Sequence, residues 1–420
     1  IAFTVCFAVW TIFAIIGIQI KQQLGLNEPQ FGLLVGTPIL TGSVVRIFLG
    51  IWTDQIGGRR VYTVVMLAAA LATFLLTYAH TYTQFLIAAL GVGIAGGSFA
   101  VGIAYVSRWY PPEKQGTALG IFGAGNVGAA VTKFCAPFVL VAYGWQVTAQ
   151  VWAVAIALMA VVFWFTTKED PVEMARRARG ERPRSAWLEL EPLKNLQVWR
   201  FSRDDGVAGG AVVALSLWLP RYLIGVYKLD IESAGMLAAA YSIPASLFRA
   251  YGGHLADKYG ARRIMYWMFG VSVLITFILA YPPTEYVIQG TKGQIQFHMA
   301  TGVVTFVCLI FVLGFFMSLG KAAVYKHIPV YYPNNVGSVG GLVGMIGGLG
   351  GFVLPIAFGV LNDLTGIWTS CFMLLFVLVS AALLWMHFAI RRMERACFPD
   401  MSSLPELPEL QGLGQASARS

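Results

Sequence analysis

Apolar runs of about 20 residues recur from one end of this chain to the other, and they restrict its fold more than any other feature. A helix of about that length crosses a hydrocarbon core ~30 Å thick. Hydrophobic residues make up 57% of the chain and charged residues only 12%, against roughly 45–50% and 25% in soluble domains. The runs lack the strict alternation of apolar and polar residues that a transmembrane β-barrel would show. We therefore expect an all-α polytopic membrane protein.

Basic residues concentrate in alternate short loops between the apolar runs, so the net charge of +9 marks membrane topology rather than nucleic-acid binding. By the positive-inside rule these loops face the cytoplasm, and both termini lie there too. The five cysteines have no metal-ligand spacing, and we expect neither a metal nor a cofactor. The twelve predicted spans cover roughly residues 1–20, 31–52, 61–79, 83–109, 117–140, 146–167, 205–227, 231–252, 262–281, 300–327, 337–360 and 367–390.

A charged, proline-containing segment divides the spans into two groups of six. Residues 168–200 have the composition of a solvated linker rather than of a span. We expect an N-terminal six-helix bundle at 1–167, a cytoplasmic linker at 168–200, a C-terminal six-helix bundle at 201–392 and a cytoplasmic tail at 393–420. The sequence begins inside an apolar run without Met, which indicates a missing natural start rather than a signal peptide.

One motif occurs once in each group of six. RIFLGIWTDQIGGRR at 46–60 and RAYGGHLADKYGARR at 249–263 both read R-x-x-x-G-x-x-x-D-x-x-G-x-R-R. A second pair of segments, YPPEKQGTALGIFG at 110–123 and YYPNNVGSVGGLVG at 331–344, aligns Gly123 with Gly344. A two-fold repeat of six helices is typical of secondary transporters.

The repeated loop motif resembles that of the major facilitator superfamily, and within it the chain resembles the nitrate/nitrite porters. That family has one arginine in helix 2, one in helix 8, and glycine-rich signatures in helices 5 and 11. The matching residues are Arg46, Arg249, GIFGAGNVGAA at 120–130 and GGLVGMIGGLGGF at 340–352. The resemblance covers nearly the whole chain and implies the major facilitator fold of twelve helices. It also implies a bacterial inner membrane.

The resemblance implies that Arg46 and Arg249 hold the anion, with Asn126 in contact with it and Phe99 as an aromatic wall. Small residues let membrane helices approach closely, and they also shape a tight pocket for a small ligand, so we add Gly344 and Gly347 to the site. Pure helix packing is the alternative for the glycines, and helix–helix hydrogen bonding is the alternative for Asn126. The family also supplies aromatics from the start of helix 7, but residues 202–210 read SRDDGVAGG, and no site residue is carried over there.

The position of Arg46 supports the same role on physical grounds. It lies eight residues before Asp54, so about 12 Å deeper in the membrane. The side chain is too short to snorkel to the headgroups, and an arginine at the centre of the membrane costs at least about 2.5 kcal/mol on insertion scales. A structural ion pair is the other alternative, but the neighbouring predicted helices offer no carboxylate at that depth. Arg249 repeats this geometry relative to Asp257, and two planar forks suit a small planar oxyanion.

Lys321 lies deep in the tenth predicted helix, again too far from the headgroups for easy snorkelling. A buried lysine loses its proton readily, so we expect Lys321 to couple nitrate transport to protons. A structural contact with a carbonyl or a distant carboxylate is the alternative. The repeated loops are expected to latch the cytoplasmic face, or only to mark topology, through Asp54, Arg59, Arg60, Asp257, Arg262 and Arg263.

The sequence thus predicts a secondary active transporter that moves nitrate by alternating access, as a nitrate/proton symporter. A nitrate/nitrite antiporter or nitrite exporter of the same family is the nearest alternative, and a transporter-like anion sensor is the alternative from another class. The chain has no hydrolase, phosphate-loop or metalloenzyme motif, so an enzyme is not expected. Its expected partners are nitrate or nitrite, protons and the lipid bilayer, and it is expected to work as a monomer.

Overall fold

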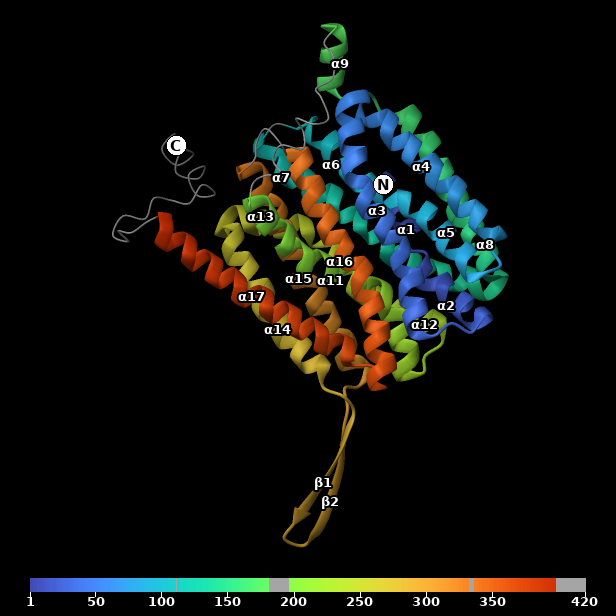
Figure 1. Ribbon diagram of the computed structural model, residues 1–420, viewed down its shortest axis with the longest axis vertical. Helices are drawn as coiled ribbons and strands as arrows, with labels where there is room; N and C mark the ends of the chain where they lie inside the picture. The colour runs from blue at the N-terminus through green and yellow to red at the C-terminus, as the bar shows by residue number, and fades with distance from the viewer. Residues whose placement is uncertain (111, 181–195, 332–335, 398–420) are drawn as a thin grey trace.

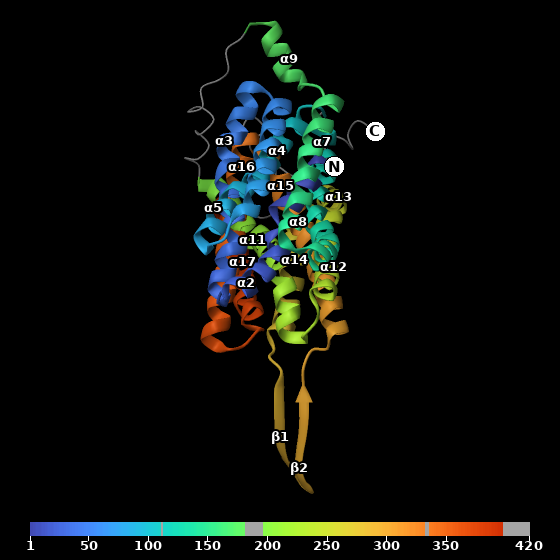
Figure 2. The same ribbon diagram turned by 90° about the vertical axis from the view of Figure 1, so that its right-hand side faces the viewer.

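The computed structural model describes residues 1–110, 112–180, 196–331 and 336–397, and these form a body of long helices. A two-stranded hairpin projects from one end of the body, and the short helix α9 lies at the opposite end (Figures 1 and 2). The helices are α1 Ala2–Trp10, α2 Phe13–Leu24, α3 Glu28–Ile56, α4 Gly58–Leu75, α5 Tyr82–Val92, α6 Ser98–Ser107, α7 Pro112–Gly123, α8 Gly128–Thr166, α9 Pro171–Ala178, α11 Leu196–Tyr227, α12 Ile231–Leu247, α13 Arg249–Tyr259, α14 Ala261–Ala280, α15 Val303–Tyr331, α16 Val336–Thr365 and α17 Ser370–Cys397, with short 3₁₀ turns η1 Leu76–Tyr78, η2 Gly93–Gly97 and η3 Ala124–Val127.

The predicted all-α membrane architecture is confirmed. Among the described residues, 10 helical segments are long and apolar enough to cross a membrane. One of them, Ala118–Thr166, contains two predicted spans that meet at Gly144, where φ is 84°. The remaining predicted span, 231–252, is not among the 10 segments found in the described residues; it corresponds to α12, which has 17 residues, and the start of α13, which has 11. We call α1–α8 the first half and α11–α17 the second half.

Several helices break at a similar depth in the body. The first span changes from α1 to α2 at Thr11, whose backbone N–H and hydroxyl both donate to the carbonyl of Phe7. The 3₁₀ turns η2 and η3 interrupt the fourth and fifth spans, and the eighth breaks at Phe248, directly before Arg249. Such interruptions free backbone carbonyls inside the protein, which membrane helices tolerate where other groups satisfy them.

The aspartate-glycine turns of the two repeated loops have the same backbone conformation. Gly57 ends α3 with φ 95°, and Gly260 ends α13 with φ 84°. These values lie in the left-handed region, where a Cβ atom would be strained, so only glycine fits without cost. The two motif copies therefore make equivalent turns.

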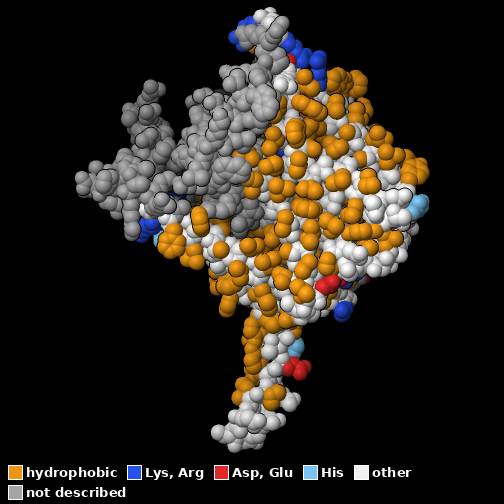
Figure 3. Space-filling view, in the orientation of Figure 1, with side chains coloured by type: hydrophobic (Ala, Val, Ile, Leu, Met, Phe, Trp, Pro, Cys, Tyr) orange, Lys and Arg blue, Asp and Glu red, His pale blue; other side chains and the backbone are white. Residues whose placement is uncertain are grey.

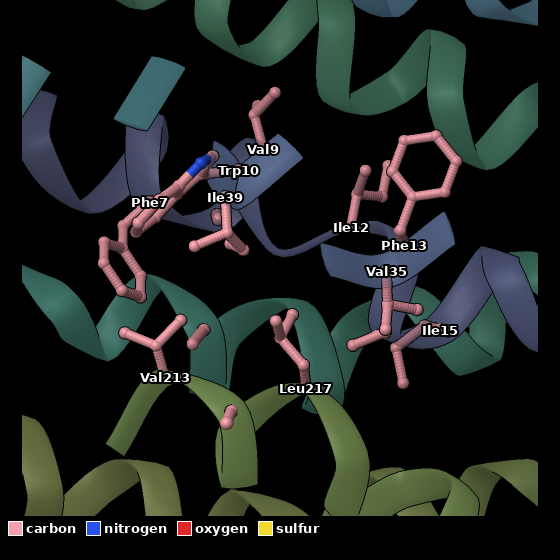
Figure 4. Packing of buried hydrophobic residues seen from close by; sticks show 14 of the residues in the cluster. Phe7, Val9, Trp10, Ile12, Phe13, Ile15, Val35, Ile39, Val213 and Leu217 are labelled. Atoms are coloured by element: carbon pink, nitrogen blue, oxygen red, sulfur yellow. The ribbon is translucent and has the colours of Figure 1, made fainter. Parts of the chain in front are cut away.

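The two halves meet along glycine-lined helix pairs, above all α3 with α16. A Cβ atom on Gly32 would lie 2.4 Å from the carbonyl oxygen of Pro355, and one on Gly36 would lie 2.9 Å from that of Phe352. Such approaches require glycine, as expected for packing inside a membrane. Figure 4 shows apolar side chains of α11, including Val213, beside residues of α1–α3.

Two connections depart from simple loops. The linker after α8 begins with α9, and the side chain of its N-cap residue Asp170 is fully buried. The connection between α14 and α15 forms an antiparallel hairpin of β1 Thr284–Gly290 and β2 Gly293–Met299, in which Tyr286 pairs with Phe297. Apolar side chains cover the visible helical body, and Lys and Arg gather beside α9 (Figure 3).

Candidate functional site

Arg46 is the first component of a buried cluster between the halves. It lies on α3 and is only 6% exposed. Its Nε donates to the carbonyl of Gly96 at 3.3 Å, a carbonyl that the 3₁₀ turn η2 leaves available. A terminal nitrogen of the same guanidinium donates to the carbonyl of Gly344 on α16, in the opposite half. The arginine thus stays inside the protein and does not reach the headgroups.

Arg249 occupies the corresponding place in the second half and is 4% exposed. Its Nη1 donates to the carbonyl of Gly123 in the first half at 3.1 Å. Each arginine therefore crosses the interface to a glycine carbonyl of the other half. Gly123 and Gly344 are the pair that the internal repeat aligns, so the contacts follow the pseudo-two-fold symmetry.

Phe99 joins the two arginines. The Cζ atoms of Arg46 and Arg249 lie 5.0 Å and 5.9 Å from the centre of its ring. A cation near an aromatic face at this range is attracted by the ring quadrupole. The other side of Phe99 packs on Phe3 and Phe122, whose ring centres stand 5.6 Å and 6.1 Å away. The ring is thereby held beside both guanidiniums, where it forms a wall of the cluster.

Gly344 lies where these groups converge. A Cβ atom on Gly344 would lie 3.1 Å from the hydroxyl of Tyr325, 3.3 Å from Nη1 of Arg46 and 3.5 Å from the ring of Phe99. The absent side chain keeps the space between a cation, a phenol and a phenyl edge open. The structure therefore brings Arg46, Arg249, Phe99 and Gly344 together.

Asn126 and Gly347 lie close to this cluster but face differently. Asn126 follows Gly123 by one turn, is buried, and its Oδ1 has no hydrogen-bond partner among the described residues. An unsatisfied buried amide group is costly unless something binds there. The carbonyl of Gly347 instead approaches α11, 3.2 Å from where a Cβ atom on Gly210 would lie. Described contacts thus place Gly347 on the α11 side of its helix.

Lys321 is buried, at 8% exposure, on α15. It lies one helical turn before Tyr325, so the two side chains share a helix face. The predicted coupling residue therefore belongs to the same helix face as the wall of the arginine cluster.

The first loop motif packs against the end of α8. The backbone nitrogen of Arg59 donates to Glu169 at 3.1 Å, and its guanidinium carbon lies 4.2 Å from the ring centre of Trp164. Asp170 pairs with Arg108 at 3.0 Å. Arg60, Arg262 and Arg263 lie at the same loops, partly or fully exposed. The side chains of Asp54 and Asp257 lie outside the described residues.

Sequence reasoning missed two aromatic residues of the arginine cluster, Tyr325 and Trp10, and one buried cation, Lys133. Tyr325 stands with its ring 5.6 Å from that of Phe99, and Arg249 lies 6.0 Å from it. Trp10 lies 5.3 Å from the Cζ atom of Arg46 and donates its indole N–H to the carbonyl of Pro38 at 2.8 Å. Together they supply aromatic walls, whereas the sequence has no Tyr or Phe at 202–210. Lys133, a fully buried cation in an apolar run, met the criterion that identified Arg46 and was overlooked.

The chemistry of the cluster suits a small anion. Two guanidiniums in one buried space repel each other, and an anion between them removes that repulsion and accepts charge-assisted hydrogen bonds. Glycine carbonyls now accept from both arginines, but a neutral carbonyl is a weaker partner than an oxyanion. Among the described residues the walls of the cluster are largely aromatic, whereas a sugar would require many hydroxyl partners.

Comparison with known proteins places the chain. The profile of the Major Facilitator Superfamily matches residues 1–298 and 234–401. The chain is 44% identical to the "Probable nitrate/nitrite antiporter NarK1" of Thermus thermophilus over 94% of this chain and 90% of that protein. It is 28% identical to the "Nitrite extrusion protein" of Bacillus subtilis, covering 92% of each. It is 30% identical to the "Probable nitrate transporter NarT" of Staphylococcus aureus, covering 92% and 93%.

Solved structures show the same fold. A bacterial homologue of the human lysosomal transporter Spinster, inward-facing and occupied, matches with a TM-score of 0.65 at 15% identity, over 93% of this chain and 95% of that one. The nucleoside transporter NupG (D323A mutant) matches with a TM-score of 0.67 at 16% identity, over 92% and 97%. At such identities the likeness concerns the fold alone.

Proposed function

This chain belongs to the nitrate/nitrite porters of the major facilitator superfamily, and we propose that it imports nitrate with protons by alternating access. It is a multi-pass membrane transporter and not an enzyme. The observation that carries the proposal is the reciprocal pair of contacts, Arg46 to Gly344 and Arg249 to Gly123. Each half contributes one cation and one bare carbonyl to a single buried space.

Nitrate fits this arrangement for three reasons. Its charge neutralises the repulsion between the guanidiniums, its planar oxygens match their forks, and its small size suits the space beside Gly344. Because each arginine belongs to a different half, an anion held by both would draw the halves together around it. Rocking of the halves about this anion then exposes it to one side of the membrane and then to the other. Asn126, which is buried one turn after Gly123 and whose side-chain NH2 can donate to an anion, is proposed to complete the site.

The orientation follows from the cationic loops. We place the α9 end, where Lys and Arg gather, in the cytoplasm of a bacterial cell and the hairpin end outside its inner membrane. Both termini are then cytoplasmic, and a monomer contains the whole site. The loop arginines, of which Arg59 packs against the end of α8, are proposed to latch the cytoplasmic face. The proposed domain limits stay at 1–167, 168–200, 201–392 and 393–420.

Lys321 is proposed to provide the coupling to protons. It is buried and shares a helix face with Tyr325, which contacts the arginine cluster. A lysine charge near two arginines is tolerated more easily when an anion is present, so anion and proton are expected to bind together. Uptake of one would then favour uptake of the other.

A second candidate, exchange of nitrate for nitrite, is favoured by the names of the Thermus thermophilus and Bacillus subtilis relatives. Proteoliposomes separate the two. A symporter accumulates nitrate when only a pH gradient is imposed, whereas an exchanger requires nitrite or nitrate inside and ignores the gradient. Binding of nitrate without any flux would instead indicate an anion sensor.

The arginine site is tested in the same vesicles with Arg46→Lys and Arg249→Lys. Lysine keeps the charge but loses the planar fork, so each variant should lose most of its nitrate flux. Arg391→Lys, an exposed position at the end of α17, is the matched control and should transport normally. Near-normal flux in either site variant would refute the proposed site.

A further inference from the structure

Lys133 makes an unusual contact between the halves. Its side chain is fully buried on α8, and its Nζ lies 2.6 Å from Oγ of Ser216 on α11 and 2.5 Å from Oγ of Ser242 on α12. The two hydroxyls are themselves 3.1 Å apart, so the three groups form a closed triangle. One corner belongs to the first half and two belong to the second.

The triangle lies on the hairpin side of the arginine site. Ser242 precedes Arg249 by seven residues, and Lys133 follows Asn126 by seven, which is about 10 Å along each helix. The end of α11 marks the hairpin side, because Tyr227 there donates to Thr301, which follows the hairpin. At this level the halves are in close contact, since a Cβ atom on Gly235 would lie 2.4 Å from the carbonyl oxygen of Lys133.

The described surroundings of Lys133 hold no carboxylate that could pair with it. Its only partners among the described residues are the two serine hydroxyls. The nearby elements carry several other titratable or charged groups. Those with partners of their own are Lys21 on α2 beside Glu28 on α3, Arg221, Tyr222 and Tyr227 on α11, Tyr241 on α12 and Arg249 on α13. The others are the free thiols of Cys6 on α1 and Cys135 on α8, the exposed Tyr143 on α8, and Glu232 in the first turn of α12.

The surroundings of Lys133 in this structure disfavour its charged form. A dry ammonium without a carboxylate is costly to bury, and two hydroxyls only partly offset the loss of water. A neutral amine fits better, because it can both donate to and accept from the two hydroxyls of the triangle. When the halves separate on the hairpin side, water reaches the nitrogen and the cation becomes the favoured form.

We infer that Lys133, with Ser216 and Ser242, is a proton-binding site that controls the outer gate: the neutral lysine closes the two halves together, and protonation from outside opens them. This inference rests on the proposed alternating-access transport and on the proposed orientation, and it adds a site distinct from the arginine cluster. Acid outside would then open the transporter toward the side from which nitrate and protons enter.

The test measures the gate without any substrate. Spin labels at Gln22 and Asp363, on exposed hairpin-side ends of α2 and α16, report the separation of the halves in nanodiscs between pH 5 and 9, in a background with the native cysteines replaced. We expect the long-distance population to grow as pH falls. For one proton, the open-to-closed ratio changes by up to about tenfold per pH unit.

Three variants are expected to change the pH dependence of opening in three different ways. Lys133→Met has no charge to hydrate and should stay closed at every pH. Lys133→Arg keeps its charge and should stay open across the range. Ser216→Ala combined with Ser242→Ala removes both hydrogen-bond partners of the buried lysine, so the closed state is destabilised and opening should move to higher pH. This double variant also tests the inference if a Lys133 variant fails to fold.

The inference would be overturned if the distance between the labels does not change with pH in the protein that keeps Lys133, Ser216 and Ser242. It would also be overturned if the Lys133→Met variant is open. The outcome is separable from that of the proposed function, because no anion is present. Loss of nitrate flux alone would refute the transport proposal and leave the gate in place. A gate without pH dependence in a protein that transports nitrate would refute only the gate.

Discussion

Arg46 donates a hydrogen bond from α3 to the carbonyl of Gly344 on α16, in the opposite half of the chain. Arg249 donates to Gly123 across the same interface at 3.1 Å. The internal repeat relates the two arginines to each other and the two glycines to each other. The arginines therefore form a reciprocal pair rather than two separate cations, and the loss of one should affect the whole site.

The space beside Gly344 should be intolerant of a methyl group. Gly344→Ala would place a Cβ atom 3.1 Å from the Tyr325 hydroxyl and 3.3 Å from Arg46, so we expect nitrate flux to fall at least about tenfold, equivalent to ~1.4 kcal/mol. Gly270→Ala, where the added atom meets nothing within 4 Å, is the control. Equal transport by both variants in proteoliposomes would show that the space is not part of the site.

Phe99 should set the affinity for the anion through both arginines. Phe99→Leu removes the ring near which both guanidiniums lie, and a cation–π contact contributes about 0.5–2 kcal/mol. We expect KM for nitrate to rise roughly three- to thirtyfold, because the arginines lose their common support. Phe277→Leu, at a side chain that is 61% exposed on α14, should leave KM unchanged. An unaltered KM in Phe99→Leu would exclude this role.

Lys321 should determine whether a proton gradient drives nitrate accumulation. Lys321→Met and Lys321→Ala remove the titratable charge, so we expect an imposed pH gradient no longer to concentrate nitrate inside the vesicles. The steady-state ratio of internal to external nitrate provides the measurement, because the initial rate also depends on external pH through the proposed Lys133 gate. Lys258→Met, an exposed lysine near the end of α13, is the control. If both Lys321 variants still accumulate nitrate along the gradient, Lys321 does not couple protons.

The ion pair at the hairpin end should hold the halves together there. Glu28 of α3 accepts from Nε of Arg221 on α11 at 3.2 Å and lies 3.4 Å from Lys21. Glu28→Gln leaves two cations facing a neutral amide, and losing a largely buried partner costs about 3–5 kcal/mol. We expect the labels at Gln22 and Asp363 to report more open protein, and a lower melting temperature. Glu232→Gln, which has no ion pair among the described residues, should change neither.

The turn of the first loop motif should require glycine for two reasons. Gly57→Ala puts a side chain at φ 95° and within 2.5 Å of the Glu169 carboxylate. Gly260→Ala has the same backbone conformation, with φ 84°, but nothing within 4 Å of the added atom, so it reports backbone strain alone, of about 1–3 kcal/mol. We expect Gly57→Ala to lower the melting temperature further than Gly260→Ala. Equal losses would show that contact with Glu169 contributes nothing.

The sequence predicted the helical architecture because hydropathy and helix length depend only on local composition. It also identified Arg46 and Arg249, since a charge in an apolar run is costly enough to need a reason. Lys133 met the same criterion and was still missed, because no motif drew attention to it. Tyr325 was missed for a different reason: an aromatic residue in an apolar helix gives no signal until its neighbours are known.

The sequence alone therefore determined the set of spans, the repeat, the family resemblance and the two arginines, Arg46 and Arg249, whose charges are costly to bury in a membrane. Only the tertiary structure decided what those charges contact. It showed that each arginine reaches a glycine carbonyl of the other half, that the ring of Phe99 lies near both guanidiniums, and that Lys133 closes a triangle with two serines. The reason is physical: burial cost is a property of one residue in its helix, whereas partners come from helices far apart in the chain, whose approach depends on packing.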